Sequence, residues 1–102
     1  MPIQLRTYTI NRGALKEFAT EWERTIKPLR QKLGFKIDGA WTLEATNQFV
    51  WIMSYDGPES WETLDRAYFE SPERHAMQPD PARHIARMEH YFMETVTPRG
   101  GW

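Results

Sequence analysis

The sequence contains no cysteine among its 102 residues, which excludes disulfides, thiolate nucleophiles and zinc–thiolate sites. It also lacks a long hydrophobic run, and none approaches the roughly 18 residues of a membrane span. Net charge is nearly absent, because 13 basic residues offset 14 acidic ones. A chain with no basic block is not expected to bind nucleic acid or an anionic membrane. No charged region precedes an apolar stretch at the N-terminus, so we predict no signal peptide and a cytoplasmic protein.

Aromatic residues, in contrast, are abundant, at 14% of the chain with five tryptophans. The remaining composition, 40% hydrophobic and 26% charged, is ordinary for a folded domain. We therefore expect a single domain over residues 1–97, followed by a tail at 98–102 that has no pattern of its own. A chain this short leaves much apolar surface uncovered, so association with a second copy would stabilise it.

The clearest local pattern is an amphipathic helix after a strand at 3–10. Its apolar stripe recurs at helical spacing through Leu15, Phe18, Trp22, Ile26, Leu29 and Leu33. Charged residues occupy the other positions, so Glu21 and Arg30 are predicted to face solvent. Pro28 interrupts the helix and predicts a kink, because its ring clashes with the carbonyl of Arg24.

Two strands follow and should form a hairpin. Residues 35–45 alternate, so Phe35, Ile37, Gly39, Trp41 and Leu43 are predicted to share one face. Residues 49–55 are apolar on both faces, which is typical of a strand inside a covered sheet.

Proline punctuates the last third of the chain. Residues 56–59 are predicted to cap and open a second helix, which restarts at Ser71-Pro72. Asp80-Pro81 is predicted to open a short helix that ends near Met88, and residues 89–97 alternate as a final strand.

The element order strand–helix–strand–strand–helix–strand predicts an α+β fold of the ferredoxin-like βαββαβ type. Right-handed crossovers place both helices on one face of a four-stranded antiparallel sheet. Trp41, Trp51 and Phe92 cannot all lie under two helices, so the other face also needs a cover. We predict a homodimer that packs sheet face against sheet face.

Several segments together resemble the NIPSNAP family, over about residues 3–97. They are Gln4-Leu5-Arg6-Thr7-Tyr8-Thr9, then Gly13, Phe18 and Trp22, then 34–42, and Asn47-Gln48-Phe49-Val50-Trp51 with Tyr55-Asp56. The resemblance implies a dimeric α+β barrel in which each subunit can hold a cavity between sheet and helices. It implies no particular chemistry, because that family has no settled activity and no agreed catalytic residues.

Arg6 and Tyr8 lie two apart on the first strand and therefore share a face. A buried guanidinium needs a partner, so Arg6 either binds an acidic ligand group or forms an ion pair. The candidate carboxylates for such an ion pair are Asp38, Glu89 and Glu94.

Histidines and aromatic rings complete the candidate site. The spacing of His75, His84 and His90 matches no helical metal motif, so we predict no metal and no cofactor, and we place His90 at the dimer face. The aromatic rings either fill the core or line a cavity for a small, flat, apolar ligand. The predicted ligand-binding residues are Arg6, Tyr8, Phe18, Trp41, Tyr68 and His75.

Three functions remain open from the sequence. The first is a NIPSNAP-like homodimer of unassigned activity that binds such a ligand between sheet and helices. The second is a small monooxygenase that acts on haem or on a quinol-like aromatic, and the third is an interaction module. No residue is assigned as catalytic.

Overall fold

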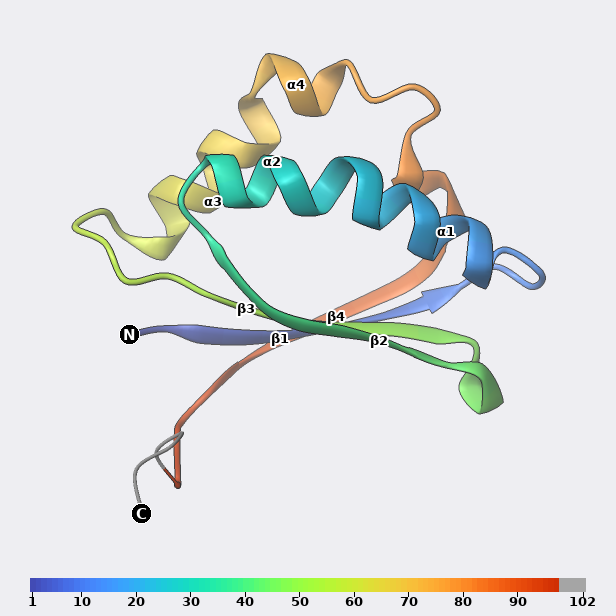
Figure 1. Cartoon of the computed structure of the whole chain (residues 1–102), viewed down its shortest axis with the longest axis horizontal. Coiled ribbons are helices and arrows are strands. Elements are labelled where there is room, and N and C mark those ends of the chain that lie inside the picture. The colour runs from blue at the N-terminus through green and yellow to red at the C-terminus, as the bar shows by residue number, and fades with distance from the viewer. Residues whose placement is uncertain (98–102) are drawn as a thin grey trace.

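One four-stranded antiparallel sheet, in the order β2-β3-β1-β4, forms the base of the molecule. The structure is a computed structural model, and it describes residues 1–97; the predicted tail at 98–102 lies outside the described residues. The α-helices cover one face of the sheet, and none of the described α-helices lies on the other face (Figure 1). The strands are β1 (Ile3–Ile10), β2 (Lys36–Leu43), β3 (Gln48–Ser54) and β4 (Ile85–Met93).

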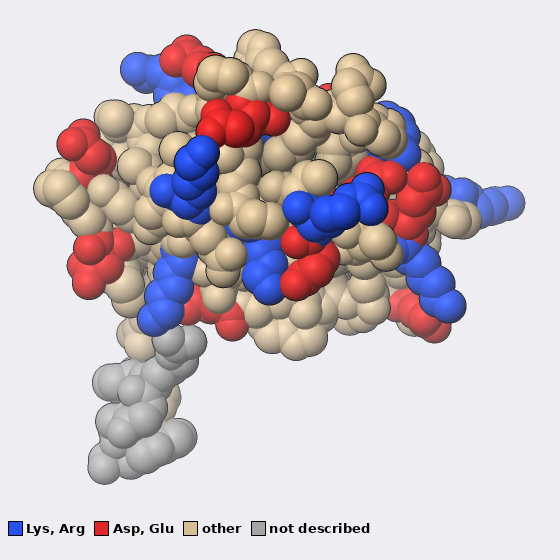
Figure 2. Space-filling view, turned by 45° about the horizontal axis from the view of Figure 1, so that its top comes forward, with Lys and Arg blue, Asp and Glu red and all other residues tan. Residues whose placement is uncertain are grey.

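The helical layer is built from short pieces, which confirms the predicted interruptions by proline. None of the helices within residues 1–97 is long and apolar enough to cross a membrane. In the space-filling view, basic and acidic side chains are interspersed over this side of the molecule (Figure 2). The pieces are α1 (Leu15–Glu21), η1 (Trp22–Ile26), α2 (Lys27–Lys32), α3 (Trp61–Glu70), α4 (Pro72–His75) and η3 (Pro81–His84). The short turn η2 (Glu44–Thr46) lies apart from them, in the connection between β2 and β3.

Strand register decides which residues face the helices. Arg6 lies opposite Trp51 on one side and opposite His90 on the other, so all three belong to the helix-covered face. Every second residue of β1, from Gln4 to Ile10, is buried there.

Aromatic rings fill the space between the first helix and the sheet. Trp22 is 2% exposed, and its ring lies 5.0 Å from that of Phe49 and 5.3 Å from that of Trp51. The predicted place of Trp22 in the core is therefore confirmed.

Pro28 is accommodated by a wide helical turn. In the π-helical segment η1, the N–H of Lys27 donates to the carbonyl of Trp22, five residues earlier. A π-turn holds one more residue than an α-turn, which rotates all that follows by about 100°. Arg30 is consequently 1% exposed, and its predicted position in solvent was wrong.

A β-bulge changes the predicted faces of β2. The register shifts between Ile37 and Gly39, so residues after Asp38 change sides. Trp41 pairs opposite Val50 on the helix-free face, whereas Phe35 is buried under the helices, so their predicted common face was wrong. The indole of Trp41 lies over Gly39, where a Cβ would come within 2.5 Å of the ring. This contact explains the glycine two residues before the tryptophan.

Two element boundaries also differ from the prediction. The second helix begins at Trp61, because the Ser60 side chain accepts a hydrogen bond from the N–H of Thr63. The last helix ends at His84, and β4 begins at Ile85 instead of residue 89, since pairing with β1 starts as far back as Ile85. Cross-strand hydrogen bonds outweigh the local helical pattern there.

Candidate functional site

Four of the six predicted ligand-binding residues lie together around Arg6, between sheet and helices. The Nη1 of Arg6 donates to the hydroxyl of Tyr8 at 3.2 Å, and the Tyr8 ring lies 5.8 Å from that of Phe18. Tyr68 is close enough for the charge of Arg6 to act on its pKa, which burial raises. These side chains belong to the packed interior, so they do not enclose an open cavity. They can only support a site that lies next to them.

Arg6 itself is 3% exposed. Its Nε donates to Oε1 of Gln4 at 2.8 Å. Within residues 1–97, the hydrogen bonds of Arg6 therefore go to neutral groups, and the predicted ion pairs with Asp38, Glu89 or Glu94 do not form. In the described part of the chain, no carboxylate is hydrogen-bonded to this guanidinium.

The structure separates Trp41 and His75 from this group. Trp41 lies on the helix-free face, so it cannot be a wall of a cavity under the helices. His75 is exposed at the end of α4, where its Nε2 lies 3.1 Å from the carbonyl oxygen of Phe69.

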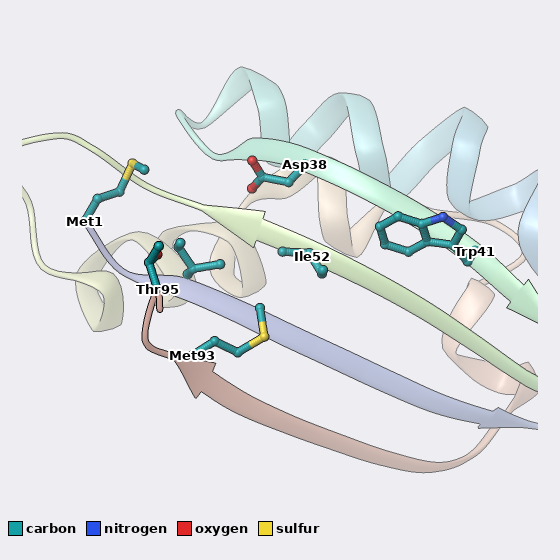
Figure 3. A pocket seen from close by; sticks show the side chains of 7 residues that line it. Met1, Asp38, Trp41, Ile52, Met93 and Thr95 are labelled. Carbon is teal, nitrogen blue, oxygen red and sulfur yellow. The ribbon is translucent and has the colours of Figure 1, made fainter. Parts of the chain in front are cut away.

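Trp41 instead borders a hollow of about 460 Å³ on the helix-free face (Figure 3). Ile52 and Met93 lie on its floor, and Met1, Asp38 and Thr95 at its edges. The hollow belongs to the face that we predicted to be covered by a second copy.

A second cleft, of about 440 Å³, lies on the helix-covered side between α3 and β4. Its walls are the aromatic rings of Trp61, Phe69 and Phe92, and the rings of Trp61 and Phe92 meet edge to face at 5.2 Å. Gln4 and His90 line it from the sheet. His90 therefore faces the helices and not the helix-free face, which corrects its predicted place. The cleft combines an apolar body with a few polar groups, as small-molecule sites do.

Hydrogen bonding fixes the orientation of Gln4 in this cleft. A guanidinium N–H can only donate, so the atom that faces Arg6 must be the amide oxygen of Gln4. The amide NH₂ of Gln4 is therefore not the group that meets Arg6, and it is the donor that this lining residue has available. Gln4 as a whole is 2% exposed, so it is closely surrounded by other residues.

A second buried arginine, Arg30, lies next to the α3 side of the cleft. Nη1 of Arg30 donates to Oδ1 of Asp65 at 2.7 Å, and Asp65 lines the cleft. The Arg30 guanidinium also lies 3.6 Å from the ring centre of Tyr68. Burial lowers the pKa of Arg30, the hydrogen bond that it donates to Asp65 opposes that shift, and the nearby charge of Arg6 adds to it. Of these two neighbouring guanidinium groups, only that of Arg30 is hydrogen-bonded to a carboxylate among residues 1–97.

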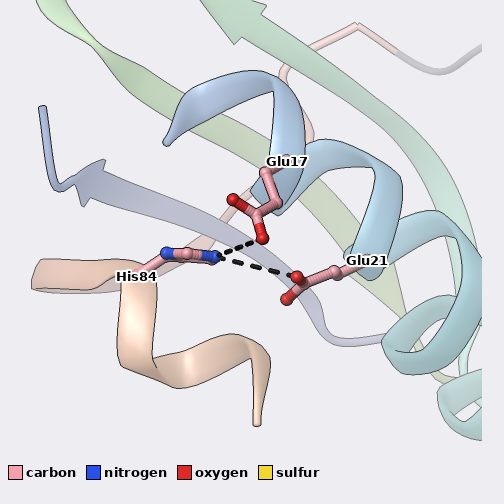
Figure 4. A group of neighbouring side chains, drawn as sticks. All are labelled: Glu17, Glu21 and His84. Carbon is pink, nitrogen blue, oxygen red and sulfur yellow. Dashed lines mark ion pairs between the residues drawn. The ribbon is translucent and has the colours of Figure 1, made fainter. Parts of the chain in front are cut away.

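A third group of polar side chains joins α1 to η3. The carboxylates of Glu17 and Glu21 lie near Nε2 of His84, at 3.6 and 3.7 Å (Figure 4). These residue types can bind a metal. Arg83, however, donates to both oxygens of Glu21 at 2.9 and 2.7 Å, so the protein supplies its own cation here. The prediction that Glu21 is solvated was wrong, because it is 6% exposed.

Sequence reasoning missed Gln4, Arg30 and Asp65, and placed His90 on the wrong face. Gln4 could have been found, because it shares the alternating face of Arg6 and Tyr8. Arg30 carried a weaker signal: it follows Trp22 and Ile26 at steps of four, and only the wide turn brings it inward.

The fold places the chain among ferredoxin-like α+β proteins, the subunit architecture of dimeric α+β barrels. The profile of the NIPSNAP family matches residues 3–98, so the chain belongs to that family. No curated protein sequence matches the chain.

Three solved structures show the same fold at low identity. A NIPSNAP domain protein from Burkholderia xenovorans superposes with a TM-score of 0.82 at 20% identity, covering 96% of this chain and 99% of its own. A NIPSNAP family protein of unknown function from Agrobacterium tumefaciens reaches 0.84 at 18% identity, covering 96% and 92%. An antibiotic biosynthesis monooxygenase reaches 0.68 at 13% identity, covering 95% and 100%.

Proposed function

We propose that this protein is a homodimer that binds a small, flat, mostly apolar molecule in the cleft between α3 and β4. The observation that carries the proposal is the cleft itself, in which three aromatic rings surround the amide of Gln4 and the imidazole of His90. Aromatic walls favour planar ligands, and the two polar groups would orient one.

The helix-free face supports the dimer. Trp41 and Tyr91 are 51% and 53% exposed there, beside the hollow floored by Ile52 and Met93. An apolar face of this kind is costly in water, and a second copy of the same face would cover it.

Ligand binding is tested by titrating 2-naphthol into ¹⁵N-labelled protein. We expect the indole N–H signal of Trp61 to shift and saturate, and the Phe92→Asp variant to lose that response. His75→Ala, on the same side but outside the cleft, is the matched control and should bind like the wild type. Unshifted Trp61 at saturating probe would contradict the proposal.

His90 favours one catalytic alternative, a cofactor-free oxygenation of a quinol-like aromatic in the same cleft. In that reaction the quinol reduces O₂, one oxygen atom enters the ring to give a hydroxyquinone, and the other leaves as water. His90 would accept the proton of the quinol hydroxyl. With 1,4-naphthohydroquinone, we expect O₂ uptake above the protein-free rate that is lost in His90→Ala and kept in His84→Ala. Equal rates in both variants would remove this alternative.

A further inference from the structure

We infer that the ligand of the α3–β4 cleft is a monoanion, a planar molecule with one carboxylate or similar oxyanion, which binds with its charged end against Gln4. This inference rests on the proposed function, because it specifies what the same cleft binds. Its basis is the charge held just behind the cleft wall.

The interior next to the cleft carries more positive than negative charge. Arg6 and Arg30 are 3% and 1% exposed; among residues 1–97, Arg30 is hydrogen-bonded to the carboxylate of Asp65, whereas Arg6 donates only to the neutral side chains of Gln4 and Tyr8. Burying an ion without a counter-charge is costly, and aromatic rings offset only part of that cost. An anion bound in the cleft would supply the negative charge that these buried arginines lack.

Gln4 connects that charge to the cleft. Its oxygen accepts from Arg6, which polarises the amide, and the NH₂ group would then donate to a ligand in the cleft that Gln4 lines. A carboxylate oxygen is the acceptor that suits a donor backed by a cation. Arg6 does not need to move for the ligand to be recognised.

The rim of the cleft limits the ligand to a single charge. Glu62, Arg66 and Glu70 of α3 line the cleft and are exposed to solvent. These carboxylates repel a second negative charge at the mouth of the cleft. The class therefore includes aromatic carboxylates and excludes nucleotides and other polyanions.

The test compares 2-naphthoate with 2-naphthamide, which have the same ring and nearly the same shape. By isothermal titration calorimetry at neutral pH, we expect the wild type to bind the carboxylate at least ten times more tightly than the amide. Equal affinity of the two probes would overturn the inference and leave the proposed function standing. If neither probe binds, the proposed function fails and takes the inference with it.

The Gln4→Glu variant gives the sharper result. It places a carboxylate against Arg6 and removes the NH₂ donor, while keeping the size of the side chain. We expect affinity for 2-naphthoate to fall at least tenfold and affinity for 2-naphthamide to change less than threefold. Equal weakening of both probes would contradict charge recognition.

A second variant addresses the rim and does not depend on the folding of Gln4→Glu. Glu62 and Glu70 are both exposed, so changing both to glutamine should leave the fold intact. We expect this variant to bind 2-naphthyl phosphate, a dianion, several times more tightly than the wild type does. An unchanged affinity for the phosphate would contradict the predicted limit to one charge.

Discussion

Removing the carboxylate of Asp65 should destabilise the protein more than removing the arginine that it binds. In Asp65→Ala the Arg30 guanidinium, 1% exposed, would keep its charge and lose its ion-pair partner. Breaking a fully buried ion pair costs about 3–5 kcal/mol. Asp65 is 26% exposed, and Tyr68 still faces the cation, so we expect a smaller loss of about 2–3 kcal/mol.

The reverse change leaves no stranded charge. In Arg30→Met the side chain remains long and apolar, and Asp65 is partly open to water. We expect this variant to lie within about 1 kcal/mol of the wild type, since replacing a buried ion by an apolar group is often nearly neutral. The double variant should resemble Arg30→Met, which would show that the two residues are coupled.

Urea unfolding followed by tryptophan fluorescence measures these differences, at one fixed protein concentration because a dimer gains stability with concentration. Glu73→Ala, which removes the partner of Lys32 in an exposed ion pair, is the matched control and should leave the free energy of unfolding nearly unchanged. The reasoning would be refuted if Asp65→Ala cost no more than Arg30→Met.

Three further predictions concern assembly, core and acid stability. Light scattering at micromolar concentration should give about twice 12.1 kDa, and Trp41→Glu should halve that mass; a wild-type monomer would contradict the dimer. Trp22→Ala should cost about 3–5 kcal/mol in urea unfolding, and a melting temperature within a degree or two of the wild type would refute its place in the core. Hydrogen bonding from Arg83 holds the pKa of Glu21 below its ordinary 4.5, so this contribution is complete above about pH 4.5 and is lost as pH falls through the lowered value. An acid titration followed by circular dichroism should therefore show Arg83→Ala unfolding at a higher pH than the wild type, and coincident curves would refute the link.

The sequence was sufficient to predict the order of strands and helices along the chain and the position of the helices on one face of an antiparallel sheet. Alternation along β1 and the stripe through Phe18 and Trp22 carry this information, because both patterns repeat over many residues. The predictions of which way individual side chains face were wrong where the chain has a one-residue irregularity. The bulge at Asp38 reversed the side on which Trp41 lies, and nothing in the local alternation marks it.

The candidate site was only partly predictable for a related reason. Arg6, Tyr8, Phe18 and Tyr68 share a neighbourhood, as expected from their elements. The open cleft lies beside them, where α3 meets β4, and the angle between those elements depends on packing that no short pattern encodes. β4 begins at Ile85, and its register with β1 places His90 opposite Arg6, on the helix-covered face. A strand predicted to begin at residue 89 did not indicate that register.

Because of the wide turn at Trp22–Ile26, the burial of the Arg30 charge depends on the number of residues before it as well as on its being an arginine. Deleting one residue from this turn would return the segment to ordinary α-helical spacing and rotate the following turn by about 100°. Arg30 would then turn out of the interior although the residue itself is unchanged. Asp65 would lose its ion pair with Arg30, whose Nη1 now lies 2.7 Å from Oδ1 of Asp65. In related chains, an insertion or deletion before the proline is therefore a better guide to an interior cation than the identity of the residue aligned with Arg30.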